Sequence, residues 1–358
     1  MESIVIIGAG NSGLAMAAHL STTGHKVRLW NRSQETIEKL QKYRYINCKG
    51  LIHKKAKLEM VTTDIKEALR DSHLILVTTP ANSHKDIAAK MAPHLNNDNL
   101  IILNPGRTFG AFEFSNILKM SRCSANPKIA ETQTIIYTCR KIGPNTVTIL
   151  SYKKNVLLCS LDPRQNKDII NQLPIPLQNH LIPASSIIET SFGNVGMILH
   201  CAPTILNTGW IESPKTIFKY YYEGITPSIS AFLEKIDKER LTVAKMLGKK
   251  LESTTDWLKR SYGISGSNLY DCIHNNVAYK TIDAPKSLKH RYLYEDIPCG
   301  LVPLEAIGNL IGVPVPMCSL VINIASEIVN EDFRKTGRNL NQLGLEGKNA
   351  KQLIKHFN

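Results

Sequence analysis

The first thirty residues combine a short apolar run, a glycine-rich turn, a helical pattern and a second apolar run. Residues 4–7 are all β-branched, as expected for a strand that is buried on both faces. The turn Gly8-Ala9-Gly10-Asn11-Ser12-Gly13 follows directly, and residues 26–30 form a second predicted strand. In a dinucleotide-binding βαβ unit, the first glycine allows the tight turn, the second lets a pyrophosphate approach the backbone, and the third lets helix and strand pack closely. We therefore predict cofactor contacts from Gly8, Gly10, Asn11, Ser12 and Gly13.

The end of the second predicted strand carries no acidic residue. Enzymes that use NAD place an acid here, which accepts hydrogen bonds from the ribose hydroxyls and repels a 2′-phosphate. This chain has Asn31-Arg32-Ser33 instead, and these side chains can donate to a phosphate. The sequence therefore predicts NADP as the cofactor, with NAD as the less favoured choice. The alternative is that Arg32 only points into solvent.

Alternating strands and helices continue through the first half of the chain. Residues 74–77, 100–103 and 128–130 have the apolar character of buried parallel strands, and a helix is predicted to end near residue 94.

Polar residues follow these strands directly. Ligands of an open parallel sheet bind beyond the carboxyl ends of its strands, so we expect Thr79, Pro80 and Asn104 near the nicotinamide. The pair Glu131-Thr132 ends the last of these strands. Glu131 either binds an ammonium or guanidinium group there or caps a turn, and the sequence leaves both alternatives open.

The hydrophobic pattern changes near residue 185. Before it, residues 53–57 are predicted to form a solvated hairpin, and short strands at 147–149 and 156–158 flank a turn. After it, apolar residues recur with the period of a helix. Long helices are predicted at 229–247 and 317–328, and shorter ones at 253–260, 267–276, 303–311 and 346–357. We therefore predict an α/β protein with a Rossmann domain at 1–184, a doubly wound parallel sheet, an all-α domain at 185–358, and the active site in the cleft between them.

Composition narrows the classes of ligand and partner. Of the net charge of +14, +11 falls in residues 1–184, which hold 24 Lys and Arg against 13 Asp and Glu. A small polyanionic ligand explains this excess better than nucleic acid, because no stripe of basic and aromatic residues accompanies it. The chain has no run of 18 apolar residues and no basic region before its first apolar run, so neither a membrane span nor a signal peptide is expected. Its eight scattered cysteines lack the spacing of a zinc site and fit reduced thiols in a cytoplasm.

Two segments of the second half carry candidate acid–base residues. His200 follows the apolar residues 197–199, and a histidine in such a place is either a satisfied core residue or a catalytic one. Residues 290–298 gather an imidazole, a guanidinium, two phenols and two carboxylates before a proline. They form either a solvated turn with Asp296 as a helix N-cap, or a site in which a carboxylate orients His200.

These segments also resemble a known family. Asn194 followed by His200, the run Asn268-Leu269-Tyr270, residues 290–296 and residues 336–347 are similar to the opine dehydrogenase family of the octopine/nopaline type. The resemblance extends from the glycine turn nearly to the C-terminus, and its specific part is the second half. Cys201 departs from the family, which usually has proline directly after the histidine.

The resemblance implies an activity and roles for several residues. The family condenses an α-keto acid, such as pyruvate, with the amine of an amino acid and reduces the imine with NAD(P)H. By resemblance, His200 and Asp296 match the catalytic pair and Arg291 matches an arginine that holds substrate. The predicted substrate-binding residues are Arg291, Glu131, Thr132, Asn194 and Tyr270, with Tyr137 and Tyr279 as further pocket candidates.

Two other functions compete with this one. A ketopantoate reductase or hydroxyacid dehydrogenase relies on a lysine early in its second domain, but residues 185–210 contain none. A sensor that binds the dinucleotide without turnover has no use for an acid–base pair. The expected partners are small keto acids and amino acids, without nucleic acid or membrane, and a homodimer is compatible with the sequence. The sequence does not set the particular substrates or the product stereochemistry.

Overall fold

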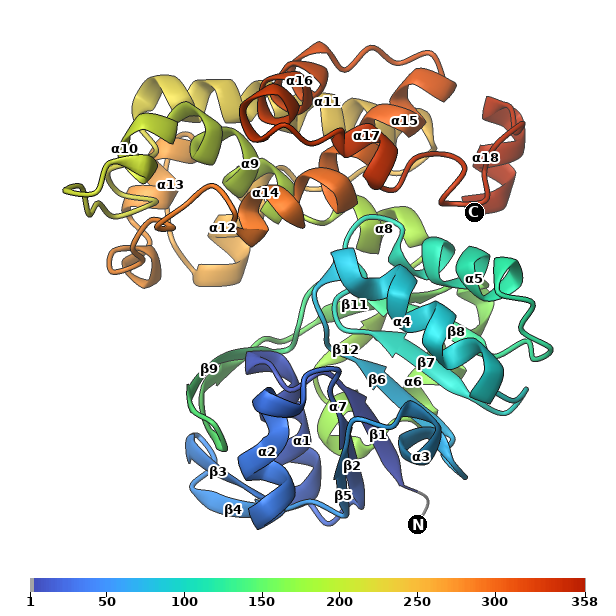
Figure 1. Ribbon diagram of the computed structural model, residues 1–358. Coiled ribbons are helices and arrows are strands. Elements are labelled where there is room, and N and C mark those ends of the chain that lie inside the picture. Colours follow the sequence, from blue (N-terminus) through green and yellow to red (C-terminus); the bar gives the residue numbers. More distant parts are fainter. Residues whose placement is uncertain (1–2, 358) are drawn as a thin grey trace. The chain divides into compact units, whose positions relative to one another are not determined.

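The computed structural model describes residues 3–357. The chain divides into two compact units, Met1–Thr190 and Ser191–Asn358. The first is an α/β unit and the second is helical (Figure 1). The predicted boundary after residue 184 lies between β12 (Leu181–Pro183) and α8 (Ile187–Phe192).

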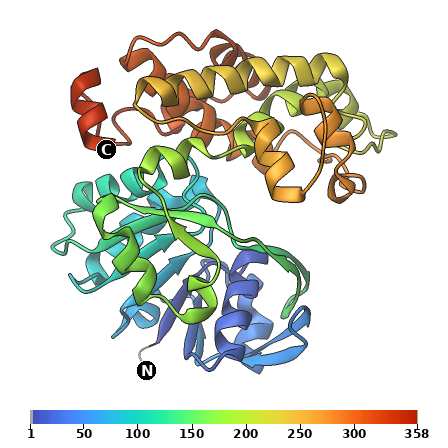
Figure 2. The ribbon, with the colours of Figure 1, turned by 180° about the vertical axis from the view of Figure 1, so that it is seen from behind.

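An eight-stranded sheet forms the centre of the first unit. Its strand order is β12-β11-β8-β7-β6-β1-β2-β5, and all neighbours are parallel except β8 and β11. The central strands are buried throughout because helices cover both faces (Figures 1 and 2). The strands are β1 (Ile4–Ile7), β2 (Val27–Trp30), β5 (Met60–Thr62), β6 (Leu74–Val77), β7 (Leu100–Leu103), β8 (Lys128–Thr132), β11 (Val156–Ser160) and β12. The predicted doubly wound parallel sheet is confirmed.

The helices of this unit connect the strands. They are α1 (Asn11–Thr22), α2 (Gln34–Tyr43), α3 (Ile65–Leu69), η1 (Ala81–Ser83), α4 (His84–Met91), η2 (Ala92–His94), α5 (Gly110–Met120), η3 (Pro163–Gln165), α6 (Asn166–Gln172) and α7 (Ile175–Gln178). Residues 13–20 of α1 are all buried. The large sheet alone cannot bury a helix on every side, so α1 requires a second covering layer.

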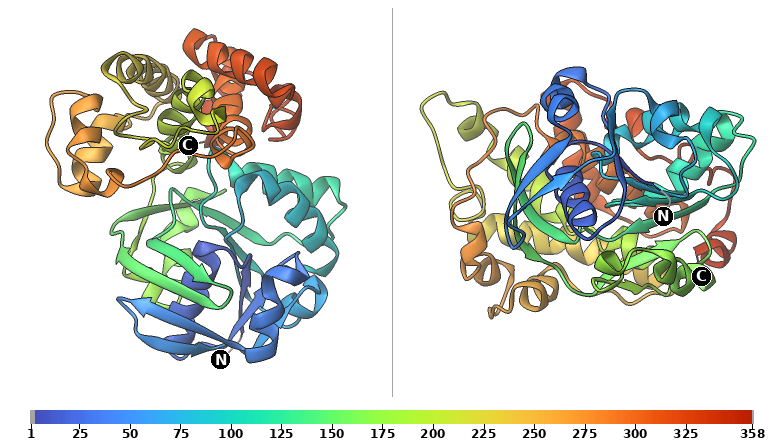
Figure 3. Two further views of the ribbon diagram at one scale, coloured as in Figure 1. Left: turned by 60° about the vertical axis from the view of Figure 1, so that its left-hand side comes forward. Right: turned by 90° about the horizontal axis from the view of Figure 1, so that it is seen from below.

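A four-stranded sheet supplies that layer. Its order is β4-β3-β10-β9, formed by β3 (Tyr45–Gly50), β4 (Lys54–Lys57), β9 (Tyr137–Gly143) and β10 (Thr146–Tyr152). The predicted hairpin at 53–57 is confirmed, since β3 and β4 pair antiparallel. Strands β3 and β10 pair parallel although they lie far apart in the sequence (Figure 3). The strands predicted on either side of residues 153–155 are present but belong to different sheets, β10 to the small one and β11 to the large one.

The second unit consists of helices packed around α9 (Gly196–Leu206) and the long α11 (Pro227–Met246), which Figure 2 shows clearly. Its other helices are α10 (Thr208–Glu212), α12 (Thr254–Tyr262), α13 (Leu269–His274), η4 (Val277–Tyr279), α14 (Arg291–Tyr294), the π-helix η5 (Ile297–Leu301), α15 (Val302–Leu310), α16 (Pro316–Val329), α17 (Phe333–Thr336) and α18 (Ala350–Phe357). The six predicted helices are confirmed, with bounds close to those expected. Within residues 3–357, no helix has both the length and the apolar character to cross a membrane.

Candidate functional site

Two of the three loop glycines are required by the fold itself. Gly8 has a φ of +110°, and a Cβ there would lie 2.9 Å from Thr79 Cγ2. A Cβ on Gly13 would lie 1.9 Å from the Gly8 carbonyl oxygen, so α1 approaches the end of β1 too closely for any side chain. These are the tight-turn and close-packing positions that the sequence predicted.

Gly10 is different, because no internal contact requires a glycine there. Its φ is −79°, it is exposed, and a Cβ would meet nothing within 4 Å. An alanine would therefore fit the protein itself, and the missing Cβ keeps open the space in front of the loop. Asn11 begins α1, whose first backbone N–H groups and positive dipole end favour an anion. The loop thus fits the pyrophosphate of a dinucleotide.

The three polar residues at the end of β2, residues 31–33, make different contacts. Asn31 Oδ1 accepts a hydrogen bond from the Ala9 N–H at 3.1 Å, which ties the strand end to the glycine loop. Ser33 Oγ accepts from the Thr36 N–H at 3.4 Å and caps α2. Arg32 is exposed, and its side chain makes no hydrogen bond or ion pair with the described residues. Of the three, Arg32 therefore has the side chain most available to a ligand.

The other predicted cofactor residues follow the carboxyl ends of β6 and β7. Thr79 is half-buried and Pro80 is exposed. The Asn104 backbone N–H donates to the Val77 carbonyl at 2.7 Å, and its side-chain amide donates to the Ile102 carbonyl at 2.9 Å. The structure thus fixes Asn104 between the ends of these neighbouring strands.

Glu131 and Thr132 lie inside the first unit. The Glu131 carboxylate is fully buried and accepts from the Ala111 N–H at 2.9 Å and from the Thr190 hydroxyl at 2.7 Å. Thr132 is also buried, and its hydroxyl donates to the Leu103 carbonyl at 3.3 Å. Of the two alternatives for Glu131, these contacts favour capping, because its carboxylate binds the first turn of α5.

His200 and Asp296 are brought together in the second unit. His200 Nδ1 lies 2.7 Å from Asp296 Oδ2, and the Asp296 side chain is fully buried. A carboxylate that accepts from Nδ1–H leaves Nε2 as the basic nitrogen. Nε2 lies 3.1 Å from the hydroxyl of Tyr221, so the three side chains form a continuous hydrogen-bonded row.

Aromatic rings surround this row. The His200 imidazole stacks on Tyr292 at a centroid distance of 4.0 Å, and Tyr221 stacks on Tyr279 at the same distance. Burial raises the pKa of the Tyr221 phenol well above its usual value, so this phenol stays protonated at neutral pH. A protonated phenol can donate to Nε2 of a neutral imidazole. The site is thus a polar row inside an aromatic wall.

The solvated-turn interpretation of residues 290–298 is wrong. The segment forms α14 and the π-helix η5, and it buries Glu295 and Asp296 to 3% and 1% exposure. Asp296 precedes η5 but its side chain makes no capping hydrogen bond. Arg291 is the exposed member, with 53% of its side chain accessible, and its Nε lies 3.0 Å from Glu295 Oε2.

The remaining predicted pocket residues differ in their surroundings. Tyr279 joins the aromatic wall through Tyr221, and Asn194 is buried. Tyr270 lies on α13, where its ring packs on His274 at 3.9 Å. The pocket role suggested for Tyr137 is wrong, because that residue is buried in the core of the first unit with its hydroxyl 3.2 Å from His19 Nδ1.

Sequence reasoning missed Tyr221, whose only signal is the run Tyr220-Tyr221-Tyr222. Three adjacent tyrosines do not reveal which of them faces the histidine. The contact depends on how the segment before α11 packs against α9, and no local pattern encodes that packing.

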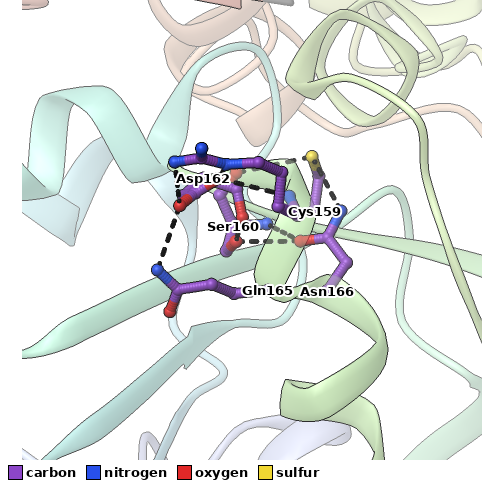
Figure 4. Close-up of polar contacts among 6 residues, drawn as sticks. Cys159, Ser160, Asp162, Gln165 and Asn166 are labelled. Carbon is purple, nitrogen blue, oxygen red and sulfur yellow. Dashed lines mark hydrogen bonds and ion pairs between the residues drawn. The ribbon is translucent and has the colours of Figure 1, made fainter.

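The first unit also contains a cluster of polar side chains at the end of β11, and its hydrogen bonds have a structural role (Figure 4). Asn166 Oδ1 accepts from both the N–H and the hydroxyl of Ser160, at 2.7 and 2.8 Å. Asp162 caps η3 and pairs with Arg164, which holds the pKa of that carboxyl well below its usual value. These contacts close the turn from β11 into α6. Among residues 3–357, no group of histidines, cysteines and carboxylates is arranged to hold a metal ion.

Known proteins resemble this chain along its whole length. Residues 183–329 match the model of the NAD/NADP octopine/nopaline dehydrogenase α-helical domain, and residues 3–108 match that of the NAD-dependent glycerol-3-phosphate dehydrogenase N-terminus. An opine dehydrogenase from Arthrobacter sp. is 36% identical over 350 residues, covering 98% of this chain and 97% of that protein. The protein ocs of Agrobacterium tumefaciens is 27% identical, covering 100% of this chain and 99% of that one. Octopine dehydrogenase with NADH and L-arginine has a similar fold, with a TM-score of 0.79 at 19% identity over 99% of this chain and 98% of that one.

Proposed function

Since this chain belongs to the NAD/NADP octopine/nopaline dehydrogenase family, we propose that it condenses an α-keto acid with the amine of an amino acid and reduces the imine. It is an NAD(P)-dependent oxidoreductase that acts on CH–NH bonds. We assign the dinucleotide to residues 1–184 and the substrate chemistry to residues 185–358. The observation that carries the proposal is the 2.7 Å contact between His200 and the buried Asp296.

His200 is the acid and base of this reaction. Imine formation needs a neutral amine, so a base must remove a proton from the ammonium of the amino acid. Loss of water from the carbinolamine then needs an acid. An imidazole can both accept and donate a proton at neutral pH, and the nicotinamide, when bound, supplies the hydride.

Asp296 and Tyr221 position the imidazole. Asp296 holds the Nδ1–H tautomer and stabilises the imidazolium that forms when Nε2 takes a proton. Tyr221 lies at Nε2, so the substrate amine either displaces the phenol or exchanges its proton through it. In both cases the acid–base nitrogen is the one that faces Tyr221.

Arg291 is the proposed clamp for the keto-acid carboxylate. Its Nε faces Glu295, while the structure describes no partner for its two terminal nitrogens among residues 3–357. A guanidinium can bind a carboxylate through two parallel hydrogen bonds, which fixes its orientation as well as its position. The ion pair with Glu295 would hold the guanidinium in place for this purpose.

The Arg291→Lys variant tests the clamp. It keeps the charge but loses the planar fork, so we expect a raised KM for the keto acid and a lower kcat, because a misplaced carbonyl carbon also misplaces the hydride acceptor. The KM of the amino acid should change less. Steady-state kinetics of both substrates measure this, with Arg260→Lys, in an exposed ion pair with Glu252, as the control. Unchanged KM values together with a lower melting temperature would make Arg291 a structural partner of Glu295 only.

We propose NADP as the cofactor in preference to NAD. Arg32 supports this choice, since it is a free cation at the strand end where NAD enzymes place an acid. The Arg32→Ala variant should lose about tenfold to a hundredfold in affinity for NADPH, the effect of one charge-assisted hydrogen bond, and almost none for NADH. Fluorescence titration with both cofactors measures the two dissociation constants. A wild-type protein that prefers NADH would contradict the proposal.

One experiment separates the proposed function from its competitors. Keto acids and amino acids are combined in a matrix, and NADPH oxidation is followed by absorbance. An opine dehydrogenase oxidises NADPH only when both substrates are present. A ketopantoate reductase or hydroxyacid dehydrogenase needs the keto acid alone, and a dinucleotide sensor oxidises nothing. The matrix also identifies the two substrates.

Location and assembly complete the proposal. Within residues 3–357, none of the eight cysteines forms a disulfide, which supports action in a reducing cytoplasm. The sequence is compatible with a homodimer, and light scattering of the purified protein measures the assembly directly.

A further inference from the structure

Strand β9 is hydrogen-bonded to the glycine loop and to the first residue of α1. The Lys141 backbone N–H donates to Asn11 Oδ1 at 2.8 Å, and the Cys139 thiol donates to the Asn11 carbonyl at 3.4 Å. The Lys141 ammonium donates to the Ala9 carbonyl at 3.3 Å. Figure 1 shows β9 running beside α1. A strand more than 120 residues downstream therefore places a cation against the second residue of the loop.

Holding the Lys141 ammonium in this position is unfavourable in free energy, because the side chain is partly removed from water. Lys141 is half-buried, and burial lowers the pKa of its ammonium. Among residues 3–357 it has no carboxylate partner, and the only hydrogen bond of its ammonium is to the Ala9 carbonyl. A partly desolvated cation is usually paired, and one neutral acceptor does not compensate an ammonium with three donors. The missing counter-charge points to an anionic ligand.

The position of Lys141 indicates which phosphate group of the cofactor it would bind. Ala9 is held on both sides: its N–H donates to Asn31 at the end of β2, and its carbonyl accepts from Lys141. The end of β2 is the place for the adenosine ribose and a 2′-phosphate, whereas the glycine loop is the place for the pyrophosphate. Lys141 contacts the loop and not the strand end.

We propose that Lys141 is a ligand of the cofactor pyrophosphate, which both NADH and NADPH carry. The proposal rests on the function proposed above only in that it requires the chain to bind a nicotinamide dinucleotide. It assigns a phosphate contact to the small sheet, whose other visible role is to bury α1. It also gives the two cations different roles, since Arg32 distinguishes the cofactors and Lys141 binds both alike.

The test compares dissociation constants of NADH and NADPH, measured by fluorescence titration, for Lys141→Gln, Lys141→Arg and a control. Arg140→Gln is the matched control, because it removes one positive charge from the adjacent, exposed position of the same strand. Lys141→Gln should weaken both cofactors about tenfold to a hundredfold, the effect of losing one charge-assisted hydrogen bond to a phosphate. Lys141→Arg should recover most of the loss, and Arg140→Gln should change neither constant more than about twofold.

The assignment would be overturned by unchanged constants in Lys141→Gln, by a loss confined to NADPH, or by equal losses in Lys141→Gln and Arg140→Gln. Melting temperatures of all variants are measured in parallel, and a loss of binding in Lys141→Gln that Lys141→Arg does not reverse also contradicts the proposal. Failure of the wild-type protein to bind either cofactor is a different result, because it contradicts the proposed function itself.

Discussion

The His200→Ala variant is expected to lose a factor of about 10² to 10⁴ in kcat, the usual contribution of general acid–base catalysis. The reason is that the buried Asp296 holds the imidazole at Nδ1, so the proposed mechanism uses Nε2 to exchange protons with the substrates. The dissociation constant of NADPH should stay near that of the wild type, since the glycine loop belongs to the other unit. Stopped-flow measurement of NADPH oxidation with saturating substrates gives kcat, and fluorescence titration gives the dissociation constant.

Asp296 provides the internal check. If it acts only through His200, the Asp296→Asn change should lower kcat in the wild type but have little further effect in His200→Ala, because groups that act as a unit are not additive. His274→Ala is the control, since the ring nitrogens of that histidine bond to the backbone carbonyls of Tyr270 and Tyr222 and not to His200 or Asp296. A His200→Ala protein that folds normally and keeps full turnover would show that His200 is a core residue.

In the first unit, the elements that could be predicted are those specified by residues adjacent in the sequence. Residues 4–13 specify an apolar strand, a turn with a positive φ and a helix that packs against the strand, and each of these follows from a few adjacent side chains. In the small sheet, the β3–β4 hairpin and strand β10 were predictable, but the way they assemble into one sheet was not. The pairing of β3 with β10 joins segments that are distant in the sequence, and the sequence of neither strand identifies the strand with which it pairs. Lys141 was missed for this reason.

In the candidate site, too, the residue types could be predicted from the sequence but their surroundings could not. The residue types at 200 and 296 indicated an acid–base pair, and the structure places them 2.7 Å apart. Their environment was not predictable, because the burial of Asp296 depends on how α14 and η5 pack against α9. Glu131 is a second example: a carboxylate at a strand end can face a ligand or a helix N-terminus. The position of α5 decides between them, and that position is a tertiary property.

A buried ion pair lies on α11, which packs against the helix that carries His200. Arg240 on α11 is 1% exposed, and its Nε donates to Asp237 Oδ1 at 2.8 Å. Its terminal nitrogens donate to the backbone carbonyls of Phe192 and Glu252, at 2.5 and 2.9 Å. Asp237 also accepts from the N–H and the hydroxyl of Thr254. One guanidinium thus joins α11 to the segments before α9 and before α12.

The Asp237→Ala variant should therefore lower the free energy of unfolding by about 3–5 kcal/mol, because it leaves the Arg240 guanidinium buried without its carboxylate. Urea unfolding followed by circular dichroism measures the loss. Arg260→Ala, in the exposed pair with Glu252, should cost less than about 1 kcal/mol and serves as the control. The double variant Asp237→Ala, Arg240→Met removes the buried charge as well and should be more stable than Asp237→Ala alone. If Asp237→Ala is no less stable than Arg260→Ala, the pair does not hold the helical unit together, and the position of His200 must depend on apolar packing around α9 instead.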